Sequence, residues 1–349
     1  MRRPSLATFA LVLASNALAC AKPPSSTCAP LGEFPGPEDF DLVTRSGHTQ
    51  ILVSATERRA PDRTESNGFW LVDWNGDRSV QRLEIHGRDA CSLAPHGVAT
   101  AEVEPGRWQL WAVTHYDAPT EGPCAGLDHA VEHFELREDG LHFLARLSDP
   151  LLTNPNDLDA LPDGRLWISN NPPWPEGKGL AGDLIFRRAK GQVLHYAPGE
   201  GFSVAADRFV FPNGIHAEPD ASQLWVAASA GDLFRLGLDG EGHEREDQRE
   251  RVRVEPKATL DNLLLDPADG SLWVAGHPKG FAFIRHAKDP AEHSPTTAYR
   301  IERGSMTTKA IGWWGEGRVD AGASVVPLTD QLVFATVFGP GLRSCDTLE

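Results

Sequence analysis

The sequence has few basic residues for its acidic ones, only two methionines, and no apolar run long enough for a transmembrane helix. A membrane span needs about 20 consecutive apolar residues. Lys plus Arg number 33 against 49 Asp plus Glu, a net charge of −16 that repels phosphate backbones and argues against a nucleic-acid partner. The scarcity of methionine, together with 33 Gly, 27 Pro and ten Trp, favours turn-rich β structure over helical bundles.

The cysteines show no CxxC spacing, which makes a zinc site improbable. Five are present, and setting Cys20 aside leaves an even number that suits disulfides in an oxidising compartment. Cys28 and Cys345, the widest pair, would join the two ends of the mature chain and close the ring of a propeller. Cys91 and Cys124 then pair by subtraction, with metal binding as the competing interpretation.

The first 19 residues resemble an export signal. Arg2 and Arg3 precede a short apolar stretch from Leu6 to Ala14, and Ala17-Leu18-Ala19 forms a small-x-small cleavage site before Cys20. A cysteine at this position suggests a lipid anchor on Cys20 and a periplasmic or outer-membrane lipoprotein. Ala17 stands where leucine is usual, so free secretion remains an alternative.

One short pattern, a turn followed by an apolar strand of the type Leu-Trp-Val, recurs along the rest of the chain. The copies are Leu110-Trp111, Leu166-Trp167, Leu224-Trp225 and Leu272-Trp273, with weaker ones at Ile51-Leu52-Val53 and Leu332-Val333-Phe334. Six copies spaced about 50–60 residues apart suit four-stranded blades. The sequence therefore predicts an all-β fold, a single six-bladed β-propeller over residues 20–349.

A second element, polar and then apolar, precedes most of these strands. It occurs at Glu38-Asp39-Phe40, His96-Gly97-Val98, Asn156-Asp157-Leu158, Asn213-Gly214-Ile215 and Asp261-Asn262-Leu263. These would begin the inner strands of the blades, and radial repetition would bring their polar residues together near the propeller axis.

The converging residues are oxygen donors, which suit calcium because that ion takes about six to eight oxygen ligands. We expect one calcium to be bound by Glu38, Asn156, Asn213, Asp261 and Asn262. Asp39, Asp157 and the backbone carbonyl of Val98 could hold a second, deeper calcium. The alternatives are a type I′ turn at Asn213-Gly214 and strand-end caps at Asp39 and Asp157.

Two histidines form a candidate catalytic pair. His96 begins an inner strand and His115 ends the neighbouring one, so antiparallel pairing could bring them into contact. Two imidazoles near a metal can activate water as a general base. His277, in Gly276-His277-Pro278, is placed similarly and is expected to shape the pocket.

Several segments together resemble the serum paraoxonase family of calcium-dependent lactonases and arylesterases, here as a bacterial-type member. They are Glu38-Asp39, Pro95-His96-Gly97-Val98, Thr114-His115-Tyr116-Asp117, Asn154-Pro155-Asn156-Asp157, Phe211-Pro212-Asn213-Gly214-Ile215, Asp261-Asn262, Leu272-Trp273-Val274, Gly276-His277-Pro278 and Thr336-Val337-Phe338. The resemblance runs from about Cys28 to Cys345.

The resemblance implies a carboxylic ester hydrolase acting on lactones and aryl esters, in which calcium stabilises the oxyanion and the pair His96 and His115 activates water. It implies that the first ligand set binds a catalytic calcium and the second a structural calcium. Phe211, His277, Val337 and Phe338 match pocket-wall positions, and Cys28 and Cys345 match a ring-closing disulfide. Small-molecule lactones or esters are the expected partners, with possible membrane attachment through Cys20 and no protein partner inferred.

Three features depart from the family. An apparently cleavable signal replaces the retained amphipathic N-terminus, and the segments Thr56 to Asn67 and Pro172 to Gly182 are dissimilar. Two alternatives therefore remain: a non-catalytic, calcium-stabilised propeller that binds a ligand or protein, and a sugar-lactone hydrolase of the gluconolactonase type.

Overall fold

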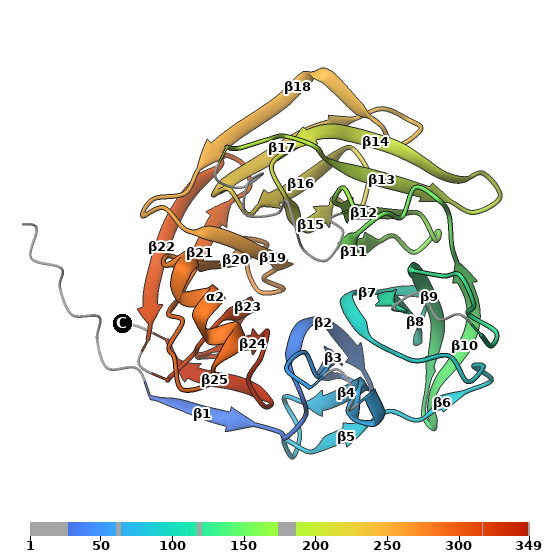
Figure 1. Ribbon diagram of the computed structural model, residues 1–349, viewed down its shortest axis with the longest axis horizontal. Helices are drawn as coiled ribbons and strands as arrows, with labels where there is room; N and C mark the ends of the chain where they lie inside the picture. Colours follow the sequence, from blue (N-terminus) through green and yellow to red (C-terminus); the bar gives the residue numbers. More distant parts are fainter. Residues whose placement is uncertain (1–26, 61–63, 117–120, 174–185, 316, 348–349) are drawn as a thin grey trace, which may run out of the picture.

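The computed structural model describes residues 27–60, 64–116, 121–173, 186–315 and 317–347, and their strands form six sheets arranged in a ring (Figure 1). The predicted six-bladed β-propeller is confirmed. The expected signal peptide and Cys20 lie outside the described residues. Among the helices of the described residues, none is long and apolar enough to cross a membrane.

Each blade contains an inner, a second, a third and an outer strand. The inner strands are β2 (Pro37–Arg45), β7 (Pro95–Glu104), β11 (Pro155–Ala160), β15 (Pro212–Ala217), β19 (Thr259–Leu265) and β23 (Gly322–Leu328). The second strands are β3 (His48–Ala55), β8 (Arg107–His115), β12 (Leu166–Asn170), β16 (Gln223–Ala228), β20 (Leu272–His277) and β24 (Gln331–Thr336). All six copies of the apolar repeat lie in these second strands.

The outer half of each blade is less regular. The third strands are β4 (Gly68–Asp73), β9 (His129–Arg137), β13 (Gly191–Ala197), β17 (Asp232–Leu238), β21 (Thr296–Glu302) and β25 (Leu342–Asp346). The outer strands are β5 (Val80–Arg82), β10 (Gly140–Leu147), β14 (Gly201–Phe209), β18 (Glu244–Arg253), β22 (Thr307–Trp314) and β1 (Cys28–Leu31). A short strand, β6 (Ile85–His86), pairs in parallel with β10 as a fifth strand of blade 2.

Blade 6 combines the two ends of the described chain. β1 pairs antiparallel with β25, and Cys28 faces Cys345 in this register. The two cysteines form the predicted disulfide across 317 residues of sequence. Cys91 and Cys124 form a second disulfide, so the metal-binding interpretation of that pair is wrong.

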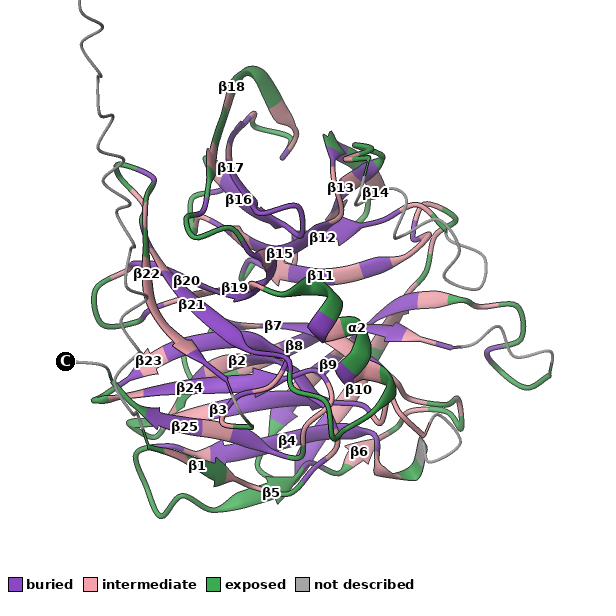
Figure 2. Cartoon of the chain, turned by 60° about the vertical axis from the view of Figure 1, so that its left-hand side comes forward, coloured by how far each residue is buried: buried purple, intermediate pink, exposed green. Residues whose placement is uncertain are grey.

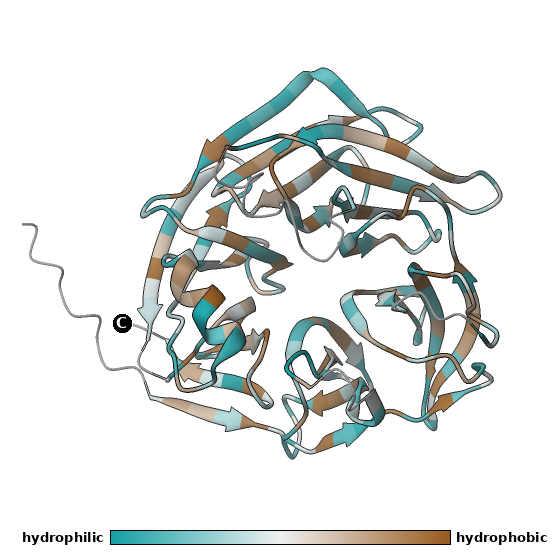
Figure 3. Ribbon diagram, in the orientation of Figure 1, coloured by the Kyte–Doolittle hydropathy of each residue, from teal (hydrophilic) through white to brown (hydrophobic). Residues whose placement is uncertain are grey.

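The hydrophobic core is divided among the interfaces between neighbouring blades. Successive side chains of a strand point to opposite faces, and the repeat uses this alternation. Leu110 packs between blades 1 and 2, whereas Trp111 packs between blades 2 and 3. Figure 2 shows buried residues along the second and third strands and an exposed β18, and Figure 3 shows apolar residues alternating with polar ones along the strands.

The inner strands are edge strands whose first residues crowd the axis. β2, β7, β11 and β15 each begin with proline, which lacks an N–H group and is tolerated at the start of an edge strand. A Cβ atom on Gly97 would lie 2.5 Å from Asp157 Cα, and one on Gly214 would lie 2.4 Å from Leu263 N. Gly214 lies so close to the backbone of β19 that no side chain fits there. Asn213 and Gly214 both belong to the strand β15, so the type I′ turn interpretation is wrong.

Two further elements were not predicted, the 3₁₀ turn η1 (Thr64–Ser66) and the helix α2 (Gly280–Lys288). The helix follows β20 and lies over blades 5 and 6 in Figure 1. Its Phe283 packs beside Phe338, with ring centroids 5.5 Å apart.

Candidate active site

A register shift interrupts strand pairing at the start of every inner strand. The shifts fall between Pro37 and Asp39, Pro95 and Val98, Pro155 and Leu158, Pro212 and Ile215, Leu260 and Leu263, and Gly322 and Val325. Bulges of this kind re-aim side chains and are frequent beside active sites. In blades 1 to 5 the shifts fall at the predicted site residues, so the usual alternation of side chains between the two faces of the sheet is broken there.

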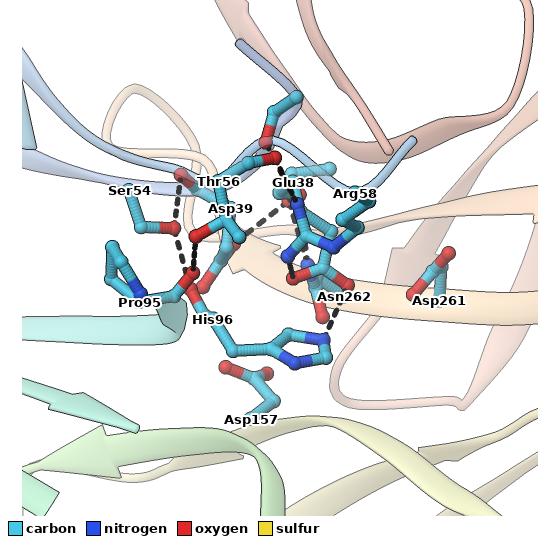
Figure 4. Close-up of polar contacts among 12 residues, drawn as sticks. Glu38, Asp39, Ser54, Thr56, Arg58, Pro95, His96, Asp157, Asp261 and Asn262 are labelled. Atoms are coloured by element: carbon cyan, nitrogen blue, oxygen red, sulfur yellow. Dashed lines mark hydrogen bonds and ion pairs between the residues drawn. The ribbon is translucent and has the colours of Figure 1, made fainter. Parts of the chain in front are cut away.

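The structure brings the strand starts of different blades into direct contact. Asn262 Nδ2 of blade 5 donates to the backbone oxygen of Glu38 in blade 1 at 3.1 Å. His96 of blade 2 places Nε2 3.0 Å from Glu38 Oε1. Figure 4 shows the Glu38 carboxylate between the His96 imidazole and the Arg58 guanidinium.

Each of the five predicted ligands of the first calcium has a buried oxygen without a hydrogen-bond partner among the described residues. These atoms are Glu38 Oε2, Asn156 Oδ1, Asn213 Oδ1, Asp261 Oδ1 and Asn262 Oδ1. Buried polar atoms are almost always paired, so five orphaned oxygens at matching places in four blades need a common explanation. Calcium takes oxygen ligands of this kind and number, and the donor set therefore fits that ion.

The second predicted set differs because its carboxylate oxygens have partners. Asp39 accepts hydrogen bonds from Val98 N at 2.9 Å and from Ser324 Oγ at 2.8 Å. Asp157 accepts from Ile215 N at 3.0 Å and from Leu158 N at 2.8 Å. Each aspartate thus bridges its own inner strand to the inner strand of the next blade, as the strand-cap alternative expects.

Burial and mutual repulsion act on the acidic groups around the axis. Burial, and then the neighbouring Asp39, raises the pKa of Asp157 well above its usual range. Burial likewise raises the pKa of Asp39, with repulsion from Glu38 adding to it. Burial would also raise the pKa of Glu38, but attraction to His96 and Arg58 leaves it lowered. A cation among these carboxylates would relieve their repulsion and hold them ionised.

His96 and His115 meet as predicted. His96 Nδ1 lies 2.8 Å from His115 Nε2, and His115 Nδ1 lies 2.8 Å from Nδ1 of a third histidine, His129. Burial, and then the neighbouring imidazoles, lowers the pKa of His115 well below its usual range, so this ring is neutral at pH 7. The three rings form a hydrogen-bonded chain that ends at Glu38.

Sequence reasoning missed His129. It is the register partner of His115, because β9 begins where β8 ends. The sequence does contain a histidine at the first position of the next strand. The register that pairs it with His115 depends on the conformation of the intervening loop, which the sequence does not reveal.

Ser324 and Arg58 were also missed. Ser324 Oγ, on the inner strand of blade 6, donates to Asp39 Oδ1 and receives a hydrogen bond from Asn262 Nδ2 at 3.0 Å. Arg58 belongs to the segment that departs from the family pattern. Its Nη1 donates to Gly36 O at 2.9 Å and its Nη2 lies 3.5 Å from Glu38 Oε2, which brings a cation to the candidate site.

The predicted pocket residues lie at the same end of the propeller. His277 Nε2 is 2.9 Å from Asp261 Oδ2, and its ring lies 4.5 Å from that of Phe283 on α2. Val337 and Phe338 pack in one cluster with Phe283, and Arg59 stacks over Phe338 at 4.9 Å. Phe211 precedes β15 with φ of 56°, a strained conformation for an aromatic residue that is typical of functional sites.

The described part of the Thr56 to Asn67 segment is fastened to its surroundings. Thr56 Oγ1 donates to Pro95 O at 2.6 Å, next to His96, and Arg59 Nη1 donates to Phe338 O at 3.0 Å. The segment that departs from the family pattern therefore contacts Pro95, the neighbour of His96, and the pocket residue Phe338. Most of the other dissimilar segment, Pro172 to Gly182, lies outside the described residues.

Comparison with known proteins agrees with this geometry. A family model described as arylesterase matches residues 58–339. The chain belongs to the arylesterase family. It is 29% identical over 323 residues to serum paraoxonase/arylesterase 2 of Rattus norvegicus, covering 87% of this chain and 84% of that protein. The resemblance to the serum paraoxonase family is thereby confirmed.

Two further proteins are similar to this chain. Serum paraoxonase/arylesterase 1 of Homo sapiens is 28% identical over 226 residues, which cover 63% of this chain and 60% of that protein. The solved structure of the calcium-binding protein regucalcin from Agrobacterium tumefaciens matches with a TM-score of 0.50 at 16% identity, over 93% of this chain and 92% of that one. This second match shows a shared fold. Membership of the arylesterase family supports a hydrolase of small-molecule esters or lactones as the general class.

Proposed function

We propose that this arylesterase is a calcium-dependent hydrolase of lactones and aryl esters whose active site is the cluster around Glu38. The observation that carries the proposal is the set of five buried oxygens that have no hydrogen-bond partner among the described residues, contributed by Glu38, Asn156, Asn213, Asp261 and Asn262. A bound calcium would polarise the carbonyl oxygen of the substrate and stabilise the negative charge that develops on it.

The three-histidine chain supplies the base. His96 Nε2 faces Glu38 and the orphaned oxygens, whereas Nδ1 faces His115. A neutral imidazole carries one proton, so His96 can accept a proton from water at Nε2 only when its own proton is on Nδ1. That proton is then donated to His115 Nε2. In that state His96 Nε2 no longer donates to Glu38 Oε1, and the attacking water takes the place of this contact.

His115 must in turn donate from Nδ1 to His129 Nδ1, which acts as the acceptor at the end of the chain. In the opposite arrangement every hydrogen bond points towards Glu38, and His96 donates from Nε2 instead of accepting. His129 is therefore a positioning residue: when its own proton is on Nε2, its Nδ1 accepts from His115, and the chain runs in the direction in which His96 is a base. The lowered pKa of His115 supports this role, because a protonated His115 could not accept the proton of His96.

The test is hydrolysis of phenyl acetate and of five- and six-membered lactones, before and after removal of calcium. We expect turnover to disappear with the metal and to return on adding calcium but not an equal concentration of magnesium, which prefers octahedral geometry and retains its water. Calorimetric titration with calcium gives a second readout that does not depend on turnover. Full activity in the calcium-free protein would rule the proposal out, and calcium binding without hydrolysis of any substrate would favour the non-catalytic alternative.

We further infer that the chain is exported and that Cys20 carries a lipid. The two disulfides support an oxidising compartment. Expression with radiolabelled palmitate should label the wild-type protein, and Cys20→Ala should release unlabelled protein from the membrane fraction. An unlabelled wild-type protein would instead indicate free secretion.

A further inference from the structure

A second group of histidines lies on the outer edge of blade 2. His86 is the last residue of β6, and His142 lies opposite it in the parallel pairing of β6 with β10. Asp139 lies in the turn between β9 and β10. Strand pairing, rather than nearness in the sequence, thus brings the two imidazoles together, and their ring centroids are 4.7 Å apart.

The three side chains converge on one point. His142 Nε2 lies 2.8 Å from Asp139 Oδ1, and His86 Nε2 lies 3.8 Å from Asp139 Oδ2. His86 Nε2 is also 3.1 Å from the backbone oxygen of Asp139, a contact that metal binding through Nε2 would replace. One potential ligand atom from each residue lies within 4.8 Å of the other two. Ligand atoms around a tetrahedral zinc ion lie about 3.3 Å apart, given Zn–N and Zn–O distances near 2.0–2.1 Å. Small side-chain rotations would therefore be enough to close the group around an ion.

We propose that His86, Asp139 and His142 form a binding site for a divalent transition-metal ion of the zinc type. Two imidazole nitrogens and one carboxylate oxygen are borderline ligands that suit zinc, copper or nickel and not calcium. The two histidines and the aspartate are 32%, 24% and 63% exposed, so an ion could enter from solvent and keep an open coordination position for water.

Arg137 opposes metal binding in the ion-free protein. Its Nη1 lies 3.4 Å from His142 Nδ1. Arginine only donates, so this contact favours the tautomer with the proton on His142 Nε2, which donates to Asp139. A metal at Nε2 requires the proton to move to Nδ1, where Arg137 would have to withdraw. Arg137 is 52% exposed and also pairs with Glu135, which gives it an alternative partner.

The site would fasten β6 to the blade. This strand has two residues, and it is followed by the connection that leads to Cys91 and to His96. Its approach to β10 depends on Gly140, where a Cβ atom would lie 2.3 Å from Glu84 O. An ion bound by His86 and His142 would add a link between two strands that pair over only two registers.

The experiment is titration of the full chain with Zn²⁺ in the presence of saturating calcium, which occupies oxygen ligands around the axis. We expect one zinc site in the wild type and a loss of at least about tenfold in affinity in His86→Ala, His142→Ala and Asp139→Ala. Arg137→Gln should bind zinc more tightly, because the amide oxygen of glutamine can accept a hydrogen bond from His142 Nδ1–H, which arginine cannot. The melting temperature should rise with zinc in the wild type and stay unchanged in the His142 variant.

The matched control is His293→Gln. His293 is also an exposed histidine paired to an aspartate, with Nδ1 2.9 Å from Asp320 Oδ2. We expect this variant to bind zinc as the wild type does. Equal zinc affinity in the wild type and the His86, Asp139 and His142 variants would overturn the proposal. Asp139 lies in an exposed turn, so Asp139→Ala tests the site even where a histidine variant folds poorly.

Discussion

Glu38 and Asp39 are consecutive acidic residues of β2, yet their carboxylates have opposite surroundings. Glu38 Oε2 has no hydrogen-bond partner in the described part of the chain, whereas both Asp39 oxygens accept hydrogen bonds from other blades. Asn156 and Asp157 repeat this contrast on β11. The first residue of each pair has a buried oxygen without a hydrogen-bond partner among the described residues, and the second joins neighbouring blades through its hydrogen bonds.

The difference teaches that residue type alone does not define a ligand. Both members of each pair are oxygen donors, both are placed by the same bulge, and both lie near the axis. What distinguishes the two residues is whether their side-chain oxygens are hydrogen-bonded. A buried oxygen without a hydrogen bond costs free energy of folding, whereas a hydrogen-bonded one does not. If this distinction is functional, substitution of the first residue should mainly lower turnover, and substitution of the second should mainly change stability.

The largest effect should follow removal of an unpaired oxygen. Asp261→Ala and Asn213→Ala should each lower lactone hydrolysis on the order of a thousandfold, because the metal contributes several kcal/mol of charge stabilisation and each 1.36 kcal/mol is tenfold in rate. Initial rates and calcium titration measure the change. Asn75→Ala, at an exposed asparagine, is the control. Wild-type turnover in either variant would break the comparison.

A smaller loss should follow from breaking the histidine chain at its far end. His129→Leu removes the acceptor for His115 and should lower kcat about 10–100-fold with little change in KM. His129→Asp keeps an acceptor and should retain most of the activity. His133→Gln, on the same strand, is the control, because His133 bonds Gln109 at 2.9 Å, away from the chain. Equal activity of the Leu and Asp variants would show that the direction of the hydrogen bonds does not matter.

The second residue of each pair should affect stability more than turnover. Asp157→Asn replaces one of the two oxygens that accept from Leu158 N and Ile215 N by an NH₂ group, which cannot accept, so the protein should melt lower. The gain in melting temperature on adding calcium should also shrink. Thermal melts with and without calcium measure both terms. Asp159→Asn is the matched control, because Asp159 makes the equivalent bond to Ala217 N at 2.7 Å further along the same strand. An unchanged calcium response would leave Asp157 as a strand cap only.

The smallest effect should lie outside the axis altogether. Burial lowers the pKa of His133 to about 4, against about 6.5 in an unfolded chain. Between these values the unfolded state binds a proton that the folded state does not, so the free energy of unfolding falls as pH falls from 6.5 to 4. His133→Gln should flatten this fall in denaturant titrations at pH 7 and pH 4.5, without changing calcium binding. An identical slope in the variant would contradict the assignment.

Much of the fold could be predicted because propeller blades are local units. The pair Leu110 and Trp111 indicated an apolar strand, and the same pattern identified the other blades. The structure places these strands second in each blade, with both faces buried. The inner strand of blade 6 was missed because its first residues, Gly322, Ala323 and Ser324, include no carboxylate or amide side chain of the kind that marks most of the other inner strands. The fifth strand of blade 2 was missed because a two-residue strand has no period to detect.

The sequence by itself determined the number of blades and the chemical type of the residues at five of the six inner-strand starts, because these follow from short repeated patterns. It also paired the terminal cysteines, because joining the two ends of the chain closes the ring. Only the tertiary structure decided which oxygens lack partners, that His129 completes the histidine chain, and that Arg58 reaches Glu38. The physical reason is that these contacts join different strands and blades, as Asn262 and Glu38 do across 224 residues, and depend on bulges that re-aim consecutive side chains.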